Sequence, residues 1–463
     1  MHRGNRVAPY DGLSATPEQV ENIEVTNLEI NYDLDWASLA SLSSWVKGEA
    51  RYVQELSGYN IISELFPWTA SEANTSDVFT EELRLTSQLD GPLQFLLGFY
   101  YEDREITYDN LGLWAGDPAL NPFAVNTILL RHDYRVDTLE QKAWFGEVSY
   151  SFEETLKFTL GFRTFEYDKE NLDQDFAAPS GFTTDQISTT TLEEEDNTFK
   201  AAIEYTPDND SLYYLSWAEG FRIGRSLPGL SNPSCDADED GLIDGSSYSM
   251  GARELDSDLV ENIEFGAKLS FLDNRLQVSA TAYKMDWTGL PVLVFLGNNQ
   301  CNVTVNGGEA ELTGLELDTS YYIGENLLFT LSGSYVNAEL SKDSSIGSAG
   351  DRLPGSAEYN LQAGLEYGFD LYGNPAFIRS DYGYVGGYYN RLAEVGDELG
   401  KFGKLNLRVG TTLSSVNVEL YVNNLTNENN FTWIDANSVG VGQNTRGYQT
   451  RPRTIGLDLT YQF

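Results

Sequence analysis

Apolar and polar residues alternate along most of the chain, which is the pattern of a β-strand with one apolar face. In the stretch 263–271, Ile263, Phe265, Ala267, Leu269 and Phe271 fall on one side and polar or small residues on the other. The same period of two recurs in residues 359–365, 416–423 and 455–463. No stretch shows a convincing helical period, so the sequence predicts an all-β protein.

Short and long connections alternate between the predicted strands. Tight turns are expected at residues 33–35, 88–92, 152–155, 206–210, 272–274, 323–326 and 413–415. Long connections are expected at roughly 57–76, 109–136, 170–190, 223–256, 291–307, 341–356, 389–400 and 427–446. This alternation is typical of an antiparallel transmembrane β-barrel with short periplasmic turns and long extracellular loops. Many strands are expected to run 12 to 17 residues, longer than the roughly 9–11 that cross a bilayer.

The pattern contains about seventeen strands, from one near 21–33 to one at 450–463. Bacterial single-chain barrels have even strand numbers with both ends on the periplasmic side. Here the first strand precedes a short turn and the last follows a long loop, so both run inward. The N-terminal residues also lack the apolar core of a signal peptide. We therefore expect strands to be missing from the N-terminus.

Composition excludes several functional classes. The formal net charge of −42 leaves no basic footprint for nucleic acid. No apolar stretch reaches the 18 residues of a transmembrane helix. Two histidines and two cysteines leave little room for a zinc or Cys/His centre, and no common catalytic motif is present, so we expect no enzyme. The acidic groups Glu153/Glu154 and Glu193–Glu195 are interpreted as solvated clusters in turns or at strand starts.

Four stretches together resemble the C-terminal part of a TonB-dependent outer-membrane receptor. They are the hairpin VENIEFGAKLSFLDNRLQVSATAYKMDW (260–287), NGGEAELTGLELD (306–318), LYVNNLTNENNF (420–431) and the terminal RPRTIGLDLTYQF. The resemblance implies a 22-stranded barrel in the bacterial outer membrane, with an N-terminal plug and a TonB box. No plug-like segment or TonB box is recognisable, so residues 1–463 are interpreted as a barrel domain that is N-terminally truncated, with about 17 of the 22 strands.

The resemblance implies uptake of a siderophore–iron complex or a similar scarce nutrient. The expected partners are outer-membrane lipid, a small nutrient ligand, and TonB if a plug and TonB box are supplied elsewhere. The C-terminal Phe463 resembles the residue that the barrel-assembly machinery reads. Three alternatives remain: a passive porin-like channel, a non-functional receptor fragment, and a soluble secreted β-protein that binds calcium.

An acidic loop, CDADEDGLIDG (235–245), resembles a calcium-binding loop. Alternate acidic residues in a tight turn place hard oxygen ligands around one cation. The candidate ligands are Asp236, Asp238, Asp240, the carbonyl of Leu242, and Asp244. The twelfth position is Ser247 and not a bidentate glutamate, so a solvated acidic loop is the alternative. We expect no organic cofactor.

The two cysteines, Cys235 and Cys301, fall in neighbouring predicted extracellular loops. An oxidising compartment permits a bridge there, and we expect them to form a disulfide. Five aromatic residues in or beside long loops are candidates for stacking on a ligand, although such residues also form membrane-interface girdles. They are Trp114, Tyr388, Tyr389, Trp433 and Tyr448.

Overall fold

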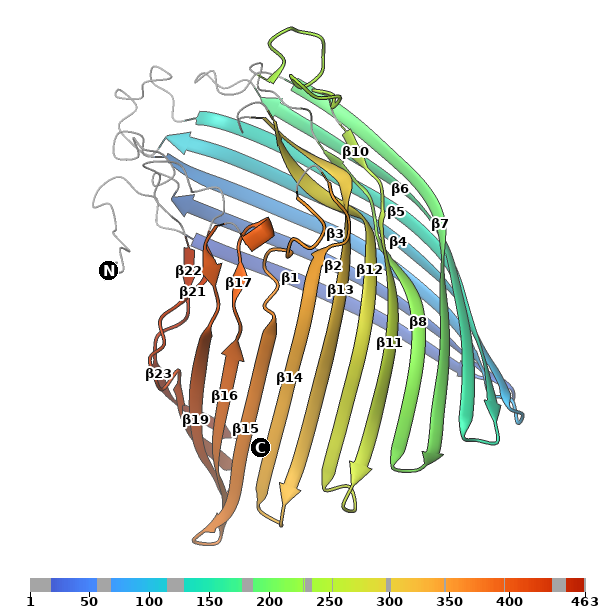
Figure 1. Ribbon diagram of the computed structural model, residues 1–463, viewed down its shortest axis with the longest axis vertical. Coiled ribbons are helices and arrows are strands. Elements are labelled where there is room, and N and C mark those ends of the chain that lie inside the picture. Colours follow the sequence, from blue (N-terminus) through green and yellow to red (C-terminus); the bar gives the residue numbers. More distant parts are fainter. Residues whose placement is uncertain are drawn as a thin grey trace.

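The protein is seen in a computed structural model that describes residues 18–55, 68–114, 129–176, 186–227, 229, 235–251, 253–296, 301–344, 347–394, 396–434 and 447–461. Its main feature is a 17-stranded antiparallel sheet (Figure 1). The strands are β1 (Glu18–Asp33), β2 (Ala37–Glu55), β3 (Trp68–Ser87), β4 (Leu93–Trp114), β5 (Leu129–Phe152), β6 (Leu156–Phe176), β7 (Gln186–Asp208), β8 (Ser211–Arg222), β11 (Asp258–Phe271), β12 (Leu276–Leu296), β13 (Cys301–Ile323), β14 (Leu327–Leu340), β15 (Tyr359–Leu371), β16 (Asn374–Val385), β19 (Phe402–Leu413), β20 (Val416–Asn423) and β23 (Thr454–Tyr461).

Each of these strands pairs with the next one along the chain, always antiparallel. The sheet curves round, so that the early strands lie behind the late ones in the view of Figure 1. The all-β prediction and the count of about seventeen strands are confirmed. Among the described residues, no helix is long and apolar enough to cross a membrane.

Smaller elements lie in the long connections. They are the hairpins β9 (Arg225–Leu227) with β10 (Arg253–Leu255), β17 (Tyr388–Tyr389) with β18 (Glu398–Leu399) and β21 (Phe431–Ile434) with β22 (Gly447–Gln449), together with the 3-10 turn η4 (Leu392–Glu394). At the other end of the sheet the strands are joined by tight turns. In one of them Glu153 and Glu154 both take positive φ, which confirms that they lie in a turn.

The two faces of the sheet differ in chemistry. One face, here called the apolar face, carries exposed large side chains that include Leu97, Trp144, Leu160, Phe199 and Ile203. Neighbouring strands are in register, so these side chains form cross-strand rows, such as Leu97–Gly146–Phe162–Phe199. The opposite face, here called the polar face, carries the charged networks described below. The alternation in the sequence therefore separates two surfaces.

Eight of the seventeen strands, β2–β7, β12 and β13, are longer than the 12 to 17 residues predicted. β4 and β5 contain 22 and 24 residues, so half of the connection predicted at 109–136 is strand. More than half of the connection predicted at 170–190 is strand as well, because β6 ends at Phe176 and β7 begins at Gln186. The predicted loop at 291–307 is also wrong for most of its length, because β12 continues to Leu296 and β13 begins at Cys301. Likewise, β3 begins at Trp68, inside the connection predicted at 57–76. The ends of β4–β7 and the start of β3 carry polar residues on both faces, whereas residues 290–296 of β12 are apolar on both, and in either case the alternation loses contrast.

Candidate functional site

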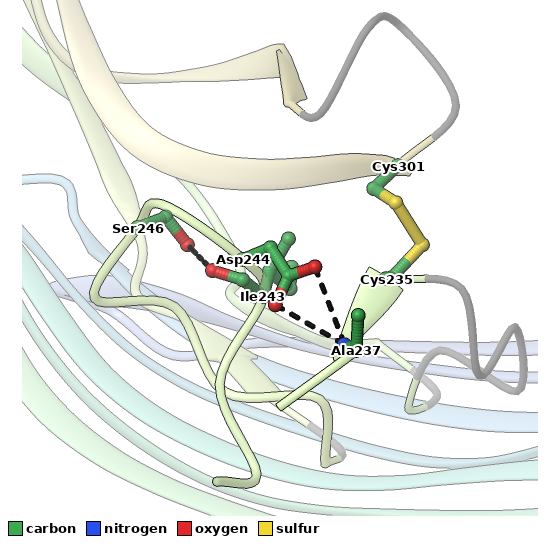
Figure 2. Close-up of a disulfide and its surroundings, with 6 residues drawn as sticks. All are labelled: Cys235, Ala237, Ile243, Asp244, Ser246 and Cys301. Atoms are coloured by element: carbon green, nitrogen blue, oxygen red, sulfur yellow. Dashed lines mark hydrogen bonds between the residues drawn. A yellow bond between two sulfur atoms is a disulfide. The ribbon is translucent and has the colours of Figure 1, made fainter. Parts of the chain in front are cut away.

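The disulfide predicted between Cys235 and Cys301 is present and ties the long loop after β8 to the start of β13 (Figure 2). The two residues are 66 positions apart, and their Cα atoms lie 5.7 Å from one another. Both are buried, and the bridge packs against Ile243, Val292 and Val303. We call residues 235–251 the disulfide lobe. Its apolar centre fixes the acidic loop to the strand ends.

Within the disulfide lobe, three of the four predicted acidic ligands come together. Carboxylate oxygens of Asp236, Asp238 and Asp244 lie within 4.8 Å of one another. Asp240 is not part of this group, and its carboxylate accepts the backbone N–H of Leu242 at 2.8 Å. Gly241 takes φ +84°, which allows the sharp turn between them. The loop thus forms the predicted turn, but three of the four predicted aspartate ligands come together instead of all four.

These carboxylates also hold the loop in shape through its own backbone. Asp236 accepts the N–H groups of Asp240 and Gly241, each at 2.9 Å. Asp244 accepts the N–H of Ala237 at 3.1 Å with one oxygen and at 3.2 Å with the other (Figure 2). Three carboxylates suit a hard cation such as calcium, which takes six to eight oxygen ligands. Backbone carbonyls and water would have to complete the set, and calcium stays a prediction.

Asp238 is affected by repulsion between the carboxylates of this loop. The negative charge of Asp240 raises the pKa of the Asp238 carboxyl, with burial and the other two carboxylates adding to the effect. Like charges favour the protonated form of one member of such a group. A bound divalent cation acts in the opposite direction, since it stabilises all three carboxylates in the ionised form.

Four of the five aromatic candidates gather at two neighbouring hairpins. The hydroxyl of Tyr388 in β17 donates a hydrogen bond of 2.7 Å to the carbonyl of Thr432 in β21. Beside it, the rings of Trp433 and Tyr448 lie 5.2 Å apart, with 44% and 70% of each side chain exposed. Tyr389 follows Tyr388 in β17 and is half-buried. We call Tyr388, Tyr389, Trp433 and Tyr448 the aromatic group.

Two candidates remain apart from the aromatic group. Trp114 ends β4, where it pairs with Trp68 of β3, and its side chain lies outside the described part of the structure. Phe463, the predicted assembly residue, also lies outside the described residues, because the description ends at Tyr461. Both assignments stay predictions.

Sequence reasoning missed a partly buried hydrogen-bond group on the polar face between β6 and β7. The hydroxyl of Tyr167 donates to the carboxylate of Glu194 and accepts the backbone N–H of Gly224 at 3.0 Å. The same carboxylate oxygen accepts the hydroxyl of Ser257 at 2.8 Å and its backbone N–H at 3.3 Å. We call Tyr167, Glu194, Gly224 and Ser257 the latch. The interpretation of Glu194 as part of a solvated cluster is therefore wrong.

The latch lies where β7 and β8 separate. Their ladder ends at Lys200 and Ala218, although β7 continues along β6 and β8 continues along β11. At the split, the backbone N–H of Phe199 donates to the Glu219 carboxylate at 2.9 Å, in place of a ladder bond. Beyond the split, the chain leaving β8 contacts β6 and β7 through β9.

An apolar cluster supports the latch from below. Leu139, Phe165 and Leu192 are almost fully buried on the polar face of β5–β7. Phe221 near the end of β8 and Ile223 just beyond it cover them, and the rings of Phe165 and Phe221 stack with centroids 3.7 Å apart. We call residues 221–227 with 253–257 the strap. The strap therefore lies across the polar face near the long-loop end of the sheet.

Charged side chains on the rest of the polar face form compact networks. Arg379 reaches Glu366 at 3.2 Å and Asp381 at 2.8 Å. Lys169, with 9% of its side chain exposed, pairs with Asp137 at 3.2 Å. These networks pair charges of opposite sign on the polar face.

Comparison with known proteins places the chain in a family. Residues 3–425 match the sequence model described as TonB dependent receptor-like, beta-barrel. The chain belongs to this family. Barrels of TonB-dependent receptors are outer-membrane proteins of Gram-negative bacteria, and the family comprises receptors and transporters.

Solved structures show the same fold at low sequence identity. The ferric yersiniabactin uptake receptor FyuA from Yersinia pestis superposes with a TM-score of 0.77 at 14% identity, over 96% of this chain and 62% of that one. The siderophore receptor PiuA from Acinetobacter baumannii gives 0.70 at 16%, over 96% and 65%. The ferric preacinetobactin receptor BauA from the same organism gives 0.68 at 16%, over 96% and 63%. This TonB-dependent receptor barrel thus spans less than two thirds of these relatives.

Proposed function

We propose that this chain forms the wall of an outer-membrane transporter, with its apolar face against lipid and its polar face towards the lumen. The observation that carries the proposal is the arrangement of side chains on the apolar face of β4–β7. Successive cross-strand rows there are apolar, from Phe152–Leu156–Tyr205 up to Leu97–Gly146–Phe162–Phe199. A soluble protein rarely exposes so large a continuous apolar surface.

Above the row of Phe99 and Trp144 the apolar face becomes charged, first with Lys142, Glu166 and Glu195 and then with a row of four carboxylates. On the same face, Asp103, Glu140, Asp168 and Glu193 lie directly opposite one another on four adjacent strands, all exposed. Like charges opposite one another destabilise a sheet unless water or cations surround them. They therefore belong outside the hydrocarbon, in the headgroup region. The rings of Phe99 and Trp144, 4.8 Å apart, lie two rows below them, as expected for an interfacial aromatic girdle.

The transported substrate in this proposal is a siderophore–iron complex or a similar scarce nutrient. Support comes from the family and from structural relatives that are receptors for ferric yersiniabactin and ferric preacinetobactin. The aromatic group is the proposed contact surface, because Trp433 and Tyr448 are exposed at the long-loop end. Coupling to TonB in this proposal depends on a plug and a TonB box, which the family resemblance implies.

The test combines membrane fractionation with uptake. The chain is expressed in a Gram-negative host, recovered from the outer membrane with detergent, and assayed for ferric siderophore binding and for uptake of radioactive iron. Trp433→Ala with Tyr448→Ala is expected to weaken binding. Tyr372→Ala is the matched control, since Tyr372 is 97% exposed in a short turn at the opposite end of the sheet. Recovery of the chain without detergent would contradict the membrane assignment.

Planar bilayers distinguish a gated receptor from a passive channel. If the chain is the wall of a gated receptor, we expect little steady ionic current across the bilayer as long as a plug fills its lumen. A large, steady current from the purified chain would favour the porin-like alternative.

A further inference from the structure

One strand in the middle of the chain, β7, has an outer part that pairs on one side. β7 pairs with β6 from Tyr205 to Gln186 without a register shift. Its ladder with β8 ends at Lys200, and within the described part of the chain no ladder joins residues 186–199 on that side. The hairpin of β9 and β10, which follows β8, pairs within itself. We call residues 187–199 of β7 the β7 edge.

The backbone of the β7 edge offers hydrogen-bond groups to the open side. The N–H of Phe199 reaches the carboxylate of Glu219 on β8, so it points away from β6. Alternate residues of a strand direct both N–H and C=O to the same side. Asn197, Glu195 and Glu193 therefore present their backbone groups in the same direction. An extended segment can take up such a row as an additional strand.

The β7 edge is accessible from outside the molecule. Its side chains on the apolar-face side are all exposed, namely Ile187, Thr189, Thr191, Glu193, Glu195, Asn197 and Phe199. On the function proposed above, Glu193 belongs to the row of carboxylates outside the hydrocarbon. The edge from Glu193 outwards therefore meets water, where unpaired backbone groups are tolerated, and it faces the exterior of the cell.

The other side of the same strand is held by the strap. Leu192 is 6% exposed under the apolar cluster, and Glu194 belongs to the latch. The ladder with β6 fixes the extended backbone over the whole length of the edge. A partner strand therefore meets a preorganised edge, and association costs little ordering of β7.

Charge defines the partner. Glu195 and Glu193 lie directly opposite Glu166 and Asp168 of β6, and all four carboxylates are exposed. Among the described residues, none of the four forms an ion pair with a basic side chain. A strand added beside β7 places alternate side chains directly opposite Glu193 and Glu195. Opposite charges across such a pair stabilise it and like charges destabilise it, so a fitting segment carries Lys or Arg there.

A second copy of the chain does not fit the β7 edge. Copies in one membrane are related by rotation about the membrane normal, so two β7 edges would run parallel. They would also bring Glu193 and Glu195 of both copies together. Charges on an edge strand commonly prevent this kind of self-pairing. The same charges favour a basic partner.

We propose that the β7 edge binds an extended basic segment of an extracellular protein as an additional antiparallel strand. Lys or Arg side chains alternate along the segment and lie opposite Glu193 and Glu195. Its backbone pairs with the open N–H and C=O groups of β7. The location outside the cell rests on the proposed function, whereas the edge and its charge do not.

A synthetic peptide tests the pairing. The probe alternates threonine and lysine, is capped at both ends, and is titrated into the purified full chain in detergent. In an antiparallel pair, a lysine opposite Glu193 directs its own N–H towards β7, because two such residues exchange both hydrogen bonds. N-methylation of the lysine amides is therefore expected to abolish binding. N-methylation of the threonine amides, which point away from β7, should leave it nearly unchanged.

Hydrogen exchange locates the bound peptide. We expect slower exchange in residues 187–197 of β7 when the unmodified peptide is bound, since a new ladder protects their N–H groups. Exchange in β4 and β5 should stay the same. Protection of another part of the chain without protection of the β7 edge would overturn the proposal.

Charge reversal tests the specificity. Glu193→Lys with Glu195→Lys is expected to weaken binding at least about tenfold, and a peptide that alternates threonine and glutamate should recover it. Asp103→Lys with Glu105→Lys is the matched control, because it makes the same change of charge on the same face, three strands away from the edge. We expect this control to retain most of the affinity.

No binding of the unmodified peptide, equal binding of the two methylated peptides, or equal loss in the two double variants would refute the β7 edge as a docking site. Each of these results leaves the proposed transporter wall standing, because that wall is tested by membrane recovery and iron uptake. Recovery of the chain without detergent removes the membrane assignment and leaves the peptide result to decide on the edge.

Discussion

The hydroxyl of Tyr167 on β6 donates a hydrogen bond to the carboxylate of Glu194, its direct cross-strand neighbour on β7. Tyr167 is 2% exposed. The same carboxylate oxygen also accepts hydrogen bonds from the backbone N–H and the hydroxyl of Ser257. One glutamate thus joins the wall of the sheet to the strap. Because the β7–β8 ladder ends at Lys200 and Ala218, this contact replaces part of the hydrogen bonding between the two strands.

Removing the charge of Glu194 is expected to loosen the strap. A hydrogen bond to a charged group contributes about 1.5–3 kcal/mol, so Glu194→Gln should lower the free energy of local opening by about 1–3 kcal/mol. Hydrogen–deuterium exchange of residues 221–227 and 253–257 measures the change. Glu193→Gln is the control, because Glu193 is exposed beside Asp168 on the other face. Equal exchange in both variants would show that the latch does not hold the strap.

Gly224 tests the same contact by sterics. A Cβ at this position would lie 2.4 Å from the carbonyl oxygen of Leu255 and 2.6 Å from Leu192 Cδ2. Gly224→Ala is therefore expected to destabilise the strap by about 1–3 kcal/mol. Gly220→Ala is the matched control, since a Cβ there has open space within 4 Å, and it should change stability by no more than about 0.5 kcal/mol. Similar exchange rates in the two variants would contradict the packing described here.

The sequence predicted the sheet well because one face is continuously apolar. Its alternation located the strands and the tight turns, and hence the disulfide between neighbouring loops. It underestimated strand length where both faces meet water, as in the stretch from Glu166 to Phe176, because a period of two needs a contrast between faces. Most of the connection predicted at residues 291–307 is strand instead, and the structure accommodates Pro291 at an irregularity in the β12–β13 ladder.

The latch was not predictable from the sequence, for a different reason. Alternation does place Glu194 on the opposite face from Glu193 and Glu195, and that signal was available. It does not give the register between β6 and β7, which sets Tyr167 opposite Glu194. Nor does it show that Ser257, 63 residues further on, folds back onto the same carboxylate. Contacts of that kind depend on the path of a long connection.

The disulfide is expected to hold the disulfide lobe and to have little effect on the sheet. In the chain-entropy model, closing a loop of this length contributes about 4 kcal/mol. The double variant Cys235→Ser with Cys301→Ser should therefore increase hydrogen exchange of residues 235–251 strongly. The heat-modified gel mobility of the barrel should stay unchanged, because the main-sheet ladders involve the bridge only at the first residue of β13. Global unfolding of the sheet in the double variant would contradict this division.

Calcium binding to the acidic loop is the last prediction. Isothermal titration of the detergent-solubilised chain with calcium is expected to show one site, and Asp238→Asn or Asp244→Asn should weaken it at least about tenfold, since each removes a carboxylate of the three-member group. Glu239→Gln is the matched control in the same loop, outside that group.

Because the pKa of Asp238 is raised, protons compete with the cation at a higher pH than for an ordinary aspartate. Affinity should therefore fall as the pH is lowered towards that pKa and level off well above it. A titration without heat at neutral pH, or equal affinity in Asp238→Asn and Glu239→Gln, would leave the loop as a solvated acidic turn held by its own backbone hydrogen bonds.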